Sequence, residues 1–151
     1  MKVLFDHQSF TGLTYGGVSR YFFDLMQSFA QRSDVTFELS LRLSNNDYLH
    51  NATFSKHWRY QPFADSMNAN RIASALNRVY SLRRIQAGRF DLFHPTFYHR
   101  YFLGAIGKKP YVITFHDATH ERYARQYPQI GAHIIDAKKA VLPGAARILT
   151  N

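Results

Sequence analysis

The chain has 151 residues, 46% of them hydrophobic, which suits one globular domain that buries about 70% of the surface its unfolded chain would expose. It contains no cysteine, which excludes disulfide scaffolds, thiol nucleophiles and thiolate metal sites. Nineteen Lys and Arg against ten Asp and Glu give a formal charge of +9, which predicts an anionic partner without choosing between nucleic acid, a membrane face and a phosphorylated substrate.

The first 43 residues predict a βαβ unit. Residues 2–5 are a short apolar run typical of a buried strand, too short for a signal peptide or a bilayer span. This predicts a cytoplasmic protein and leaves peripheral attachment to the inner membrane face open. From residue 18 apolar side chains recur on one helical face, namely Val18, Tyr21, Phe22, Leu25, Met26 and Phe29. Residues 34–43 alternate with period two, which predicts a second strand.

Residues 45–62 lack a clear period and are expected to form an irregular surface segment of the kind that often carries binding residues. A helix is expected from about residue 68, ending at Gly88 as its C-cap. Its predicted inner stripe is Ile72, Leu76, Val79 and Tyr80. Its predicted outer face carries Arg71, Arg78 and Arg84. The basic stretch 71–89 is better explained as a solvated helix face than as a nucleic-acid site.

The second half continues the alternation of strands and helices. Strands are expected over 91–94, 111–115 and 146–150, with an aromatic loop after Pro95 and a polar loop after Asp117. A helix is expected over 130–142, ended by Pro143 and Gly144. Parallel neighbours need crossover connections, so this order predicts one α/β domain, a Rossmann-like parallel sheet with helices on both faces.

Titratable residues collect where three of the predicted strands end: Asp6, His7, His94, His116 and Asp117. Ligands of open α/β sheets bind outside the carboxyl ends of strands. Strand ends are also simply where chains meet water, so each residue alone is open to either interpretation. Their coincidence favours a functional site.

A glycine pair, Gly16 and Gly17, precedes the first predicted helix. Such a turn lets a phosphate approach the backbone, where unpaired N–H groups and the helix dipole favour an anion. The spacing differs from the G-x-G-x-x-G fingerprint and no carboxylate ends the second strand, which disfavours a nicotinamide-dependent oxidoreductase.

His116, His120 and Glu121 invite a metal interpretation, since histidines four residues apart on a helix can share an ion. His116, however, ends a strand and His120 falls in the next loop, so the helical register is missing. No metal is predicted.

Four segments, YGGVSRYFFDL, DLFHPTFY, VITFHD and KKAVLPGAARILTN, resemble in order and spacing the amino-terminal domain of glycosyltransferase family 4 enzymes. The resemblance implies a GT-B fold, in which two Rossmann-like domains face each other across a cleft. The first domain mainly holds the acceptor, the second holds the sugar nucleotide, and transfer retains the anomeric configuration. Residues 1–151 are then the acceptor-side domain, with the carboxyl-terminal donor-binding domain absent and no cofactor beyond the nucleotide-sugar co-substrate.

The resemblance also assigns site residues. Gly16 and Gly17 would approach the donor diphosphate, while Arg20 either joins them or is structural. His116 would contact the transferred sugar and Asp117 would orient its neighbourhood. The acceptor, a glycan or a lipid-linked sugar, is expected to meet His94, Tyr98 and His99.

The sequence departs from the family at its carboxyl end. Two glutamates eight positions apart are expected in the donor domain, but only Glu38 and Glu121 are present, and the chain stops at Asn151 just after a strand. A fragment that is inactive alone and self-associates is therefore expected. One alternative is a non-catalytic domain that binds an anionic sugar, lipid or membrane surface. Another is a nucleic-acid module that stacks bases on Tyr98, Tyr101 and Phe102. No recognised nucleic-acid motif supports it.

Overall fold

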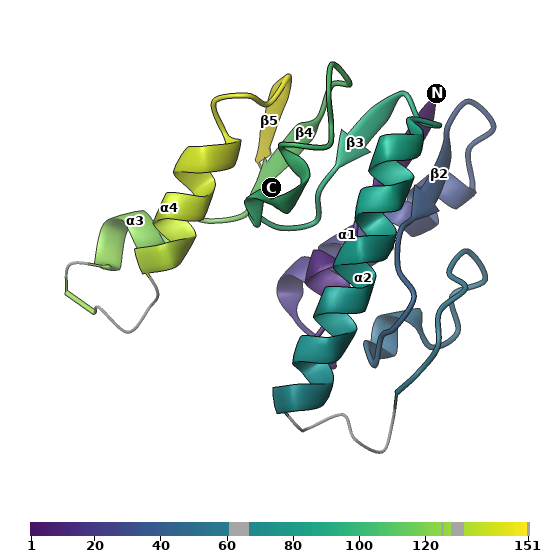
Figure 1. Ribbon diagram of the computed structural model, residues 1–151, viewed down its shortest axis with the longest axis horizontal. Helices are drawn as coiled ribbons and strands as arrows, with labels where there is room; N and C mark the ends of the chain where they lie inside the picture. Colours follow the sequence, from purple (N-terminus) through teal and green to yellow (C-terminus); the bar gives the residue numbers. More distant parts are fainter. Residues whose placement is uncertain (61–66, 125, 128–131, 151) are drawn as a thin grey trace.

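The computed structural model describes residues 1–60, 67–124, 126–127 and 132–150, which form a mixed α/β arrangement (Figure 1). The strands are β1 (Lys2–Phe5), β2 (Thr36–Leu39), β3 (Leu92–His94), β4 (Val112–Phe115) and β5 (Arg147–Thr150). The α-helices are α1 (Gly17–Ala30), α2 (Met67–Ala87), α3 (Thr119–Tyr123) and α4 (Ala132–Val141). Short 3-10 turns are η1 (Gln8–Phe10), η2 (Asp47–Leu49) and η3 (Arg100–Phe102).

Within the described residues all strand pairs are parallel, in two small sheets ordered β2-β1-β3 and β4-β5. An isolated parallel bridge between Phe93 and Tyr111 joins the sheets, and the Phe93 amide donates to the Pro110 carbonyl at 3.0 Å. The strands therefore follow one another across the molecule as β2, β1, β3, β4 and β5 (Figure 1). The chain moves from β1 to β2 in one direction and then returns past β1 to β3. This reversal creates a topological switch point between β1 and β3, where such sheets bind ligands.

Helices cover both faces of the strands, as predicted. Val3 and Phe5 pack in one apolar cluster with Phe22 of α1. Leu4, which points to the opposite face, packs in a second cluster with Ile85 of α2, and Val141 of α4 belongs to the same cluster. In Figure 1 α2 lies in front of the strands and α1 behind them. This two-sided core is compatible with a Rossmann-like layer.

Most predicted elements are present with shifted ends. The strand expected over 34–43 is shorter, because only Thr36–Leu39 pairs with β1, while Leu43 forms an isolated bridge with Trp58. Gly88 ends α2 with φ +63, a left-handed conformation that favours glycine, which confirms the predicted C-cap. Helix α3 lies where a polar loop was expected. Residues 61–62 of the irregular segment and 130–131 of the last predicted helix lie outside the described residues.

The predicted inner stripe of α2 is wrong. Ile72, Leu76 and Val79 are 61%, 53% and 48% exposed. The buried face instead carries Ala73, Asn77, Ser81 and Ile85, spaced four residues apart. This face of α2 turns inward because the backbone after β2 needs hydrogen-bond partners, and the polar side chains of this face supply them.

Asn77 shows how this works. Its Oδ1 accepts from the backbone amides of Arg42 and Leu43, both at 2.9 Å. Its Nδ2 donates to the Leu43 carbonyl at 2.7 Å and to Thr11 Oγ1 at 2.8 Å. One side chain of α2 thus joins the end of β2 to the loop after β1, and it fixes the rotation of α2 over the sheet.

Candidate functional site at the ends of β1, β3 and β4

Asp6, which follows β1, anchors the loops at the switch point. It is fully buried. Its Oδ1 accepts from the backbone amide and from Oγ1 of Thr96, both at 2.8 Å. Its Oδ2 accepts from Gln8 Nε2 at 2.7 Å and from the Tyr101 hydroxyl at 2.9 Å. Asp6 therefore holds the loop after β3 against the loop after β1, and its carboxylate is occupied by protein donors.

The glycine pair opens on a cavity of about 340 Å³. Its lining residues are Gln8, Ser9, Leu13, Gly16, Gly17, Val18, Ser19 and Phe97. Gly16 is the N-cap of α1, with an extended φ of 173, and caps the helix with no side chain. A Cβ at Gly17 would meet no atom within 4 Å. The protein therefore leaves open space at the positive end of α1.

Arg20, predicted beside the glycines, does not line this cavity. Its Nε donates to Asp24 Oδ2 at 3.0 Å, and its guanidinium lies 5.7 Å from the ring centroid of Tyr48. Both contacts are made on the exposed surface of α1, which favours the structural alternative for this arginine.

His116 follows β4 and rests against α1. Its half-buried ring makes edge contacts with Tyr21 and Phe22, at centroid distances of 5.4 and 5.7 Å. Its ring nitrogens form no hydrogen bond within the described residues, which leaves their hydrogen-bonding capacity unused. Burial lowers the pKa of His116, and Lys138 lowers it further, against a raising contribution from Asp117. The imidazole is therefore neutral at neutral pH.

Asp117 is exposed, and its Oδ1 accepts from the Thr119 amide at 2.9 Å, which lowers the pKa of the carboxyl. Its backbone carbonyl accepts from Lys138 Nζ at 2.7 Å. Lys138 is only 2% exposed. It also donates to Glu121 at 3.1 Å and lies 4.3 Å from the Phe115 ring centroid. Lys138 thus fastens the loop after β4 to α4. Nothing in the sequence signals this, because a Lys-Lys pair on a helix is typical of a solvated face.

His94 and Tyr98 lie beneath His116 rather than on the surface, each 3% exposed. His94 Nε2 is 2.9 Å from Thr114 Oγ1. Burial, with a smaller contribution from His116, lowers the pKa of His94 to about 3. The Tyr98 hydroxyl donates to the Thr114 carbonyl at 3.1 Å and accepts from the His116 amide at 3.0 Å. His94 and Tyr98 are therefore placed to hold His116 in position. Their contact with an acceptor stays a prediction.

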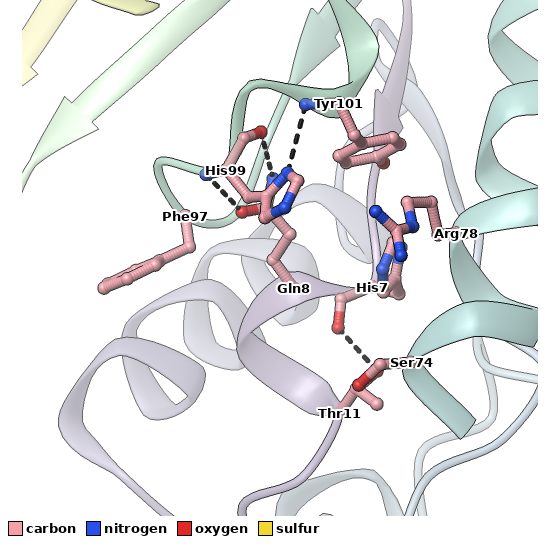
Figure 2. A pocket seen from close by; sticks show the side chains of 8 residues that line it. All are labelled: His7, Gln8, Thr11, Ser74, Arg78, Phe97, His99 and Tyr101. Atoms are coloured by element: carbon pink, nitrogen blue, oxygen red, sulfur yellow. Dashed lines mark hydrogen bonds between the residues drawn. The ribbon is translucent and has the colours of Figure 1, made fainter. Parts of the chain in front are cut away.

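His99 lies in a second cavity, of about 270 Å³, shown in Figure 2. Its lining residues are His7, Gln8, Thr11, Ser74, Arg78, Phe97, His99 and Tyr101. Gln8 and Phe97 also line the glycine cavity, so the two cavities are neighbours. The structure thus brings Gly16, Gly17 and His99 to adjoining spaces at the switch point. His116 lines neither cavity.

Arg71 and Arg78 of α2 are exposed, as the sequence predicts. Arg78 also lines the second cavity. Arg84 is half-buried and forms an ion pair with Glu38, so its predicted place on the outer face is wrong.

Comparisons with protein-family models, curated protein sequences and solved structures found no match. The structural class of the protein is therefore defined by its fold alone, which is a mixed α/β arrangement of parallel strands with helices on both faces. Among the described residues, no three metal-binding side chains come together. Within the same ranges, none of the helices has the length and apolar character needed to cross a bilayer.

Proposed function

We propose that this chain is the acceptor-side domain of a retaining glycosyltransferase of the GT-B type. It works with a donor-binding domain, in cis or in trans, to transfer a sugar from a nucleotide-sugar donor to a glycan or lipid-linked acceptor. The observation that carries the proposal is the open cavity at the glycine pair, beside the switch point and at the positive end of α1. The sequence resemblance to glycosyltransferase family 4 supports it.

The glycine cavity suits a diphosphate. The first N–H groups of a helix lack intrahelical partners, and α1 has no side-chain cap to occupy them. Together with the helix dipole they favour an anion. The leaving diphosphate gains negative charge in the transition state, so fixed donors at this position would lower the barrier. The basic groups of the donor domain would supply the remainder.

His116 suits contact with the sugar. A neutral imidazole can exchange hydrogen bonds with a sugar hydroxyl, and the edge contacts with Tyr21 and Phe22 hold its ring in one orientation. Lys138 fixes the following loop through the carbonyl of Asp117. We assign Asp117 to positioning, because its carboxylate already accepts from Thr119.

The cavity assignment is tested with Gly17→Val in the complete enzyme. A Cβ at Gly17 meets nothing within 4 Å, so the variant should fold normally while its branches obstruct the diphosphate. We expect the donor KM to rise about tenfold or more, with the melting temperature unchanged. Gly104→Val is the matched control, because a Cβ there also meets nothing within 4 Å. An unchanged donor KM in folded Gly17→Val would make the pair a simple turn.

A second candidate function, binding to an anionic lipid surface, is favoured by the outer face of α2. The outer patch consists of Arg42, Trp58, Leu76, Val79 and Arg83, around a shallow hollow lined almost entirely by apolar surface. Trp58 is 75% exposed. Exposed tryptophan and aliphatic side chains with arginines beside them suit the lipid interface. The basic side chains of this surface are Arg42 and Arg83.

We expect tighter binding to anionic than to zwitterionic vesicles, weakening as salt rises. The double variant Arg42→Gln/Arg83→Gln should lose roughly 1 kcal/mol of binding free energy per arginine. Lys139→Gln/Arg147→Gln makes the same change of charge away from α2 and is the control. Vesicle co-sedimentation measures both. Equal binding to the two vesicle types would eliminate this candidate.

A further inference from the structure

The second cavity holds a cation that the fold does not use. Arg78 reaches from α2 into the cavity, with its guanidinium beside the His7 side chain and facing the loop that carries His99 (Figure 2). Arg78 forms no ion pair within the described part of the chain. Arginine's planar fork of donors matches the oxygens of a carboxylate or a phosphate.

The hydrogen-bond partners assign a different tautomer to each histidine. Ser40 Oγ lies 2.9 Å from the Phe5 carbonyl, and Ser81 Oγ lies 2.9 Å from the Ser40 carbonyl. When each hydroxyl donates to its carbonyl, Ser81 Oγ is left to accept from His7 Nδ1 at 2.8 Å. Neutral His7 then has its lone pair on Nε2, which can take up a proton. His99 Nδ1 accepts from the Tyr101 amide at 3.1 Å, so neutral His99 carries its hydrogen on Nε2 and is already a donor.

The charges around the two histidine rings favour the binding of an anion. Burial is the main cause that lowers the pKa of His7 and of His99, and Arg78 lowers both further, so both rings are neutral at neutral pH. Arg100 adds a second positive charge near His99. Asp6 raises both pKa values, but its carboxylate is buried and already accepts hydrogen bonds from protein donors.

We propose that this cavity binds an oxyanion, either a phosphate monoester or a carboxylate carried by a small polar ligand. Arg78 supplies the fixed positive charge and His99 Nε2–H a neutral donor. His7 becomes a further donor by taking up a proton at Nε2 when the anion enters, because a nearby negative charge favours the imidazolium. Thr11, Ser74 and Gln8 line the remaining wall. The Gln8 amide is already hydrogen-bonded to Asp6 and to the His99 backbone amide.

Anion binding in this cavity does not depend on the proposed function. Only the view that the anion is the sugar acceptor rests on the proposed function. Through the shared residues Gln8 and Phe97, an anion held at Arg78 would sit beside the glycine cavity. The acceptor would then be an acidic sugar or a phosphorylated one. Binding itself does not require transfer, so the two claims fail separately.

The test is titration calorimetry of the purified, folded chain with methyl phosphate, glucuronate and, as the neutral probe, glucose. We expect saturable binding of at least one anion and none of glucose, and the two anions tell phosphate from carboxylate. Arg78→Gln should weaken binding about tenfold or more. Arg83→Gln, on the outer patch of the same helix, should change it less than about twofold. Binding of neither anion, or equal affinity in folded Arg78→Gln, would overturn the site.

Proton uptake separates the two histidines. The binding enthalpy, measured at one pH in buffers of different ionisation enthalpy, should show uptake approaching one proton per anion. His7→Gln should abolish this uptake, and His99→Gln should retain it, because the backbone amide of Tyr101 occupies His99 Nδ1. Thermal unfolding checks that both variants fold. Uptake lost in His99→Gln but kept in His7→Gln would contradict the assigned tautomers. Anion binding without any sugar transfer by the complete enzyme would keep this site and remove the glycosyltransferase.

Discussion

The imidazole of His94 is enclosed by the rings of Phe5 and Phe22, with centroids 5.4 and 5.0 Å away, and is hydrogen-bonded to Thr114. Its ordinary pKa of 6.5 falls to about 3 because burial penalises the charged ring. The unfolded chain therefore binds a proton over this range that the folded chain does not. Stability from this residue is complete above pH 6.5 and is lost as pH falls towards about 3.

We expect acidification to destabilise the fold, with His94 contributing up to about 1.4 kcal/mol per pH unit between those limits. His7, His57, His99 and His116 have lowered pKa values and act in the same direction. His94→Gln keeps a partner for Thr114 and removes the titration. Urea unfolding at a series of pH values should show a slope reduced by about one proton in the variant, and an identical slope would refute the buried neutral state.

At the scale of elements, α2 is a helix whose buried face is partly polar and whose apolar side chains are largely exposed. Asn77→Ala leaves the amides of Arg42 and Leu43 without their partner, so it should cost at least about 3 kcal/mol of unfolding free energy. Leu76→Ala, one residue away and 53% exposed, should cost less than about 1 kcal/mol. Chemical denaturation of both variants measures this. A larger loss of unfolding free energy in Leu76→Ala than in Asn77→Ala would indicate that the apolar stripe is the inner face after all.

The same contrast explains which elements were predictable. Helix α1 and strand β1 bury apolar side chains, so their periodicity correctly indicates the inner face. The buried face of α2 is polar at Asn77 and Ser81, and hydrophobic periodicity cannot detect such a face. The glycine pair could be placed beside the first strand from its position before the first predicted helix, whereas His99 is indicated only by the family resemblance. Arg78 and Lys138 could not be placed from the sequence, because their roles depend on contacts between distant parts of the chain.

At the scale of the whole molecule, the strand order explains why residues far apart in sequence meet at one edge. The reversal between β1 and β3 brings the loop carrying His7 and Gln8 against the loop carrying His99. Strand β5, on the far side of β4, is exposed along its length and presents Ile148 and Leu149. Exposed apolar edge strands favour self-association in general, and the expected self-association of this chain stays a prediction.

The most direct test of the proposed glycosyltransferase is the rate of sugar transfer by the complete enzyme carrying His116→Ala. We expect turnover to fall about a hundredfold or more while the melting temperature changes little, because the ring nitrogens of His116 form no hydrogen bond within the described residues and are assigned to the sugar. His133→Ala, an exposed histidine on α4, should keep full turnover. Full turnover by a folded His116→Ala enzyme would contradict the account.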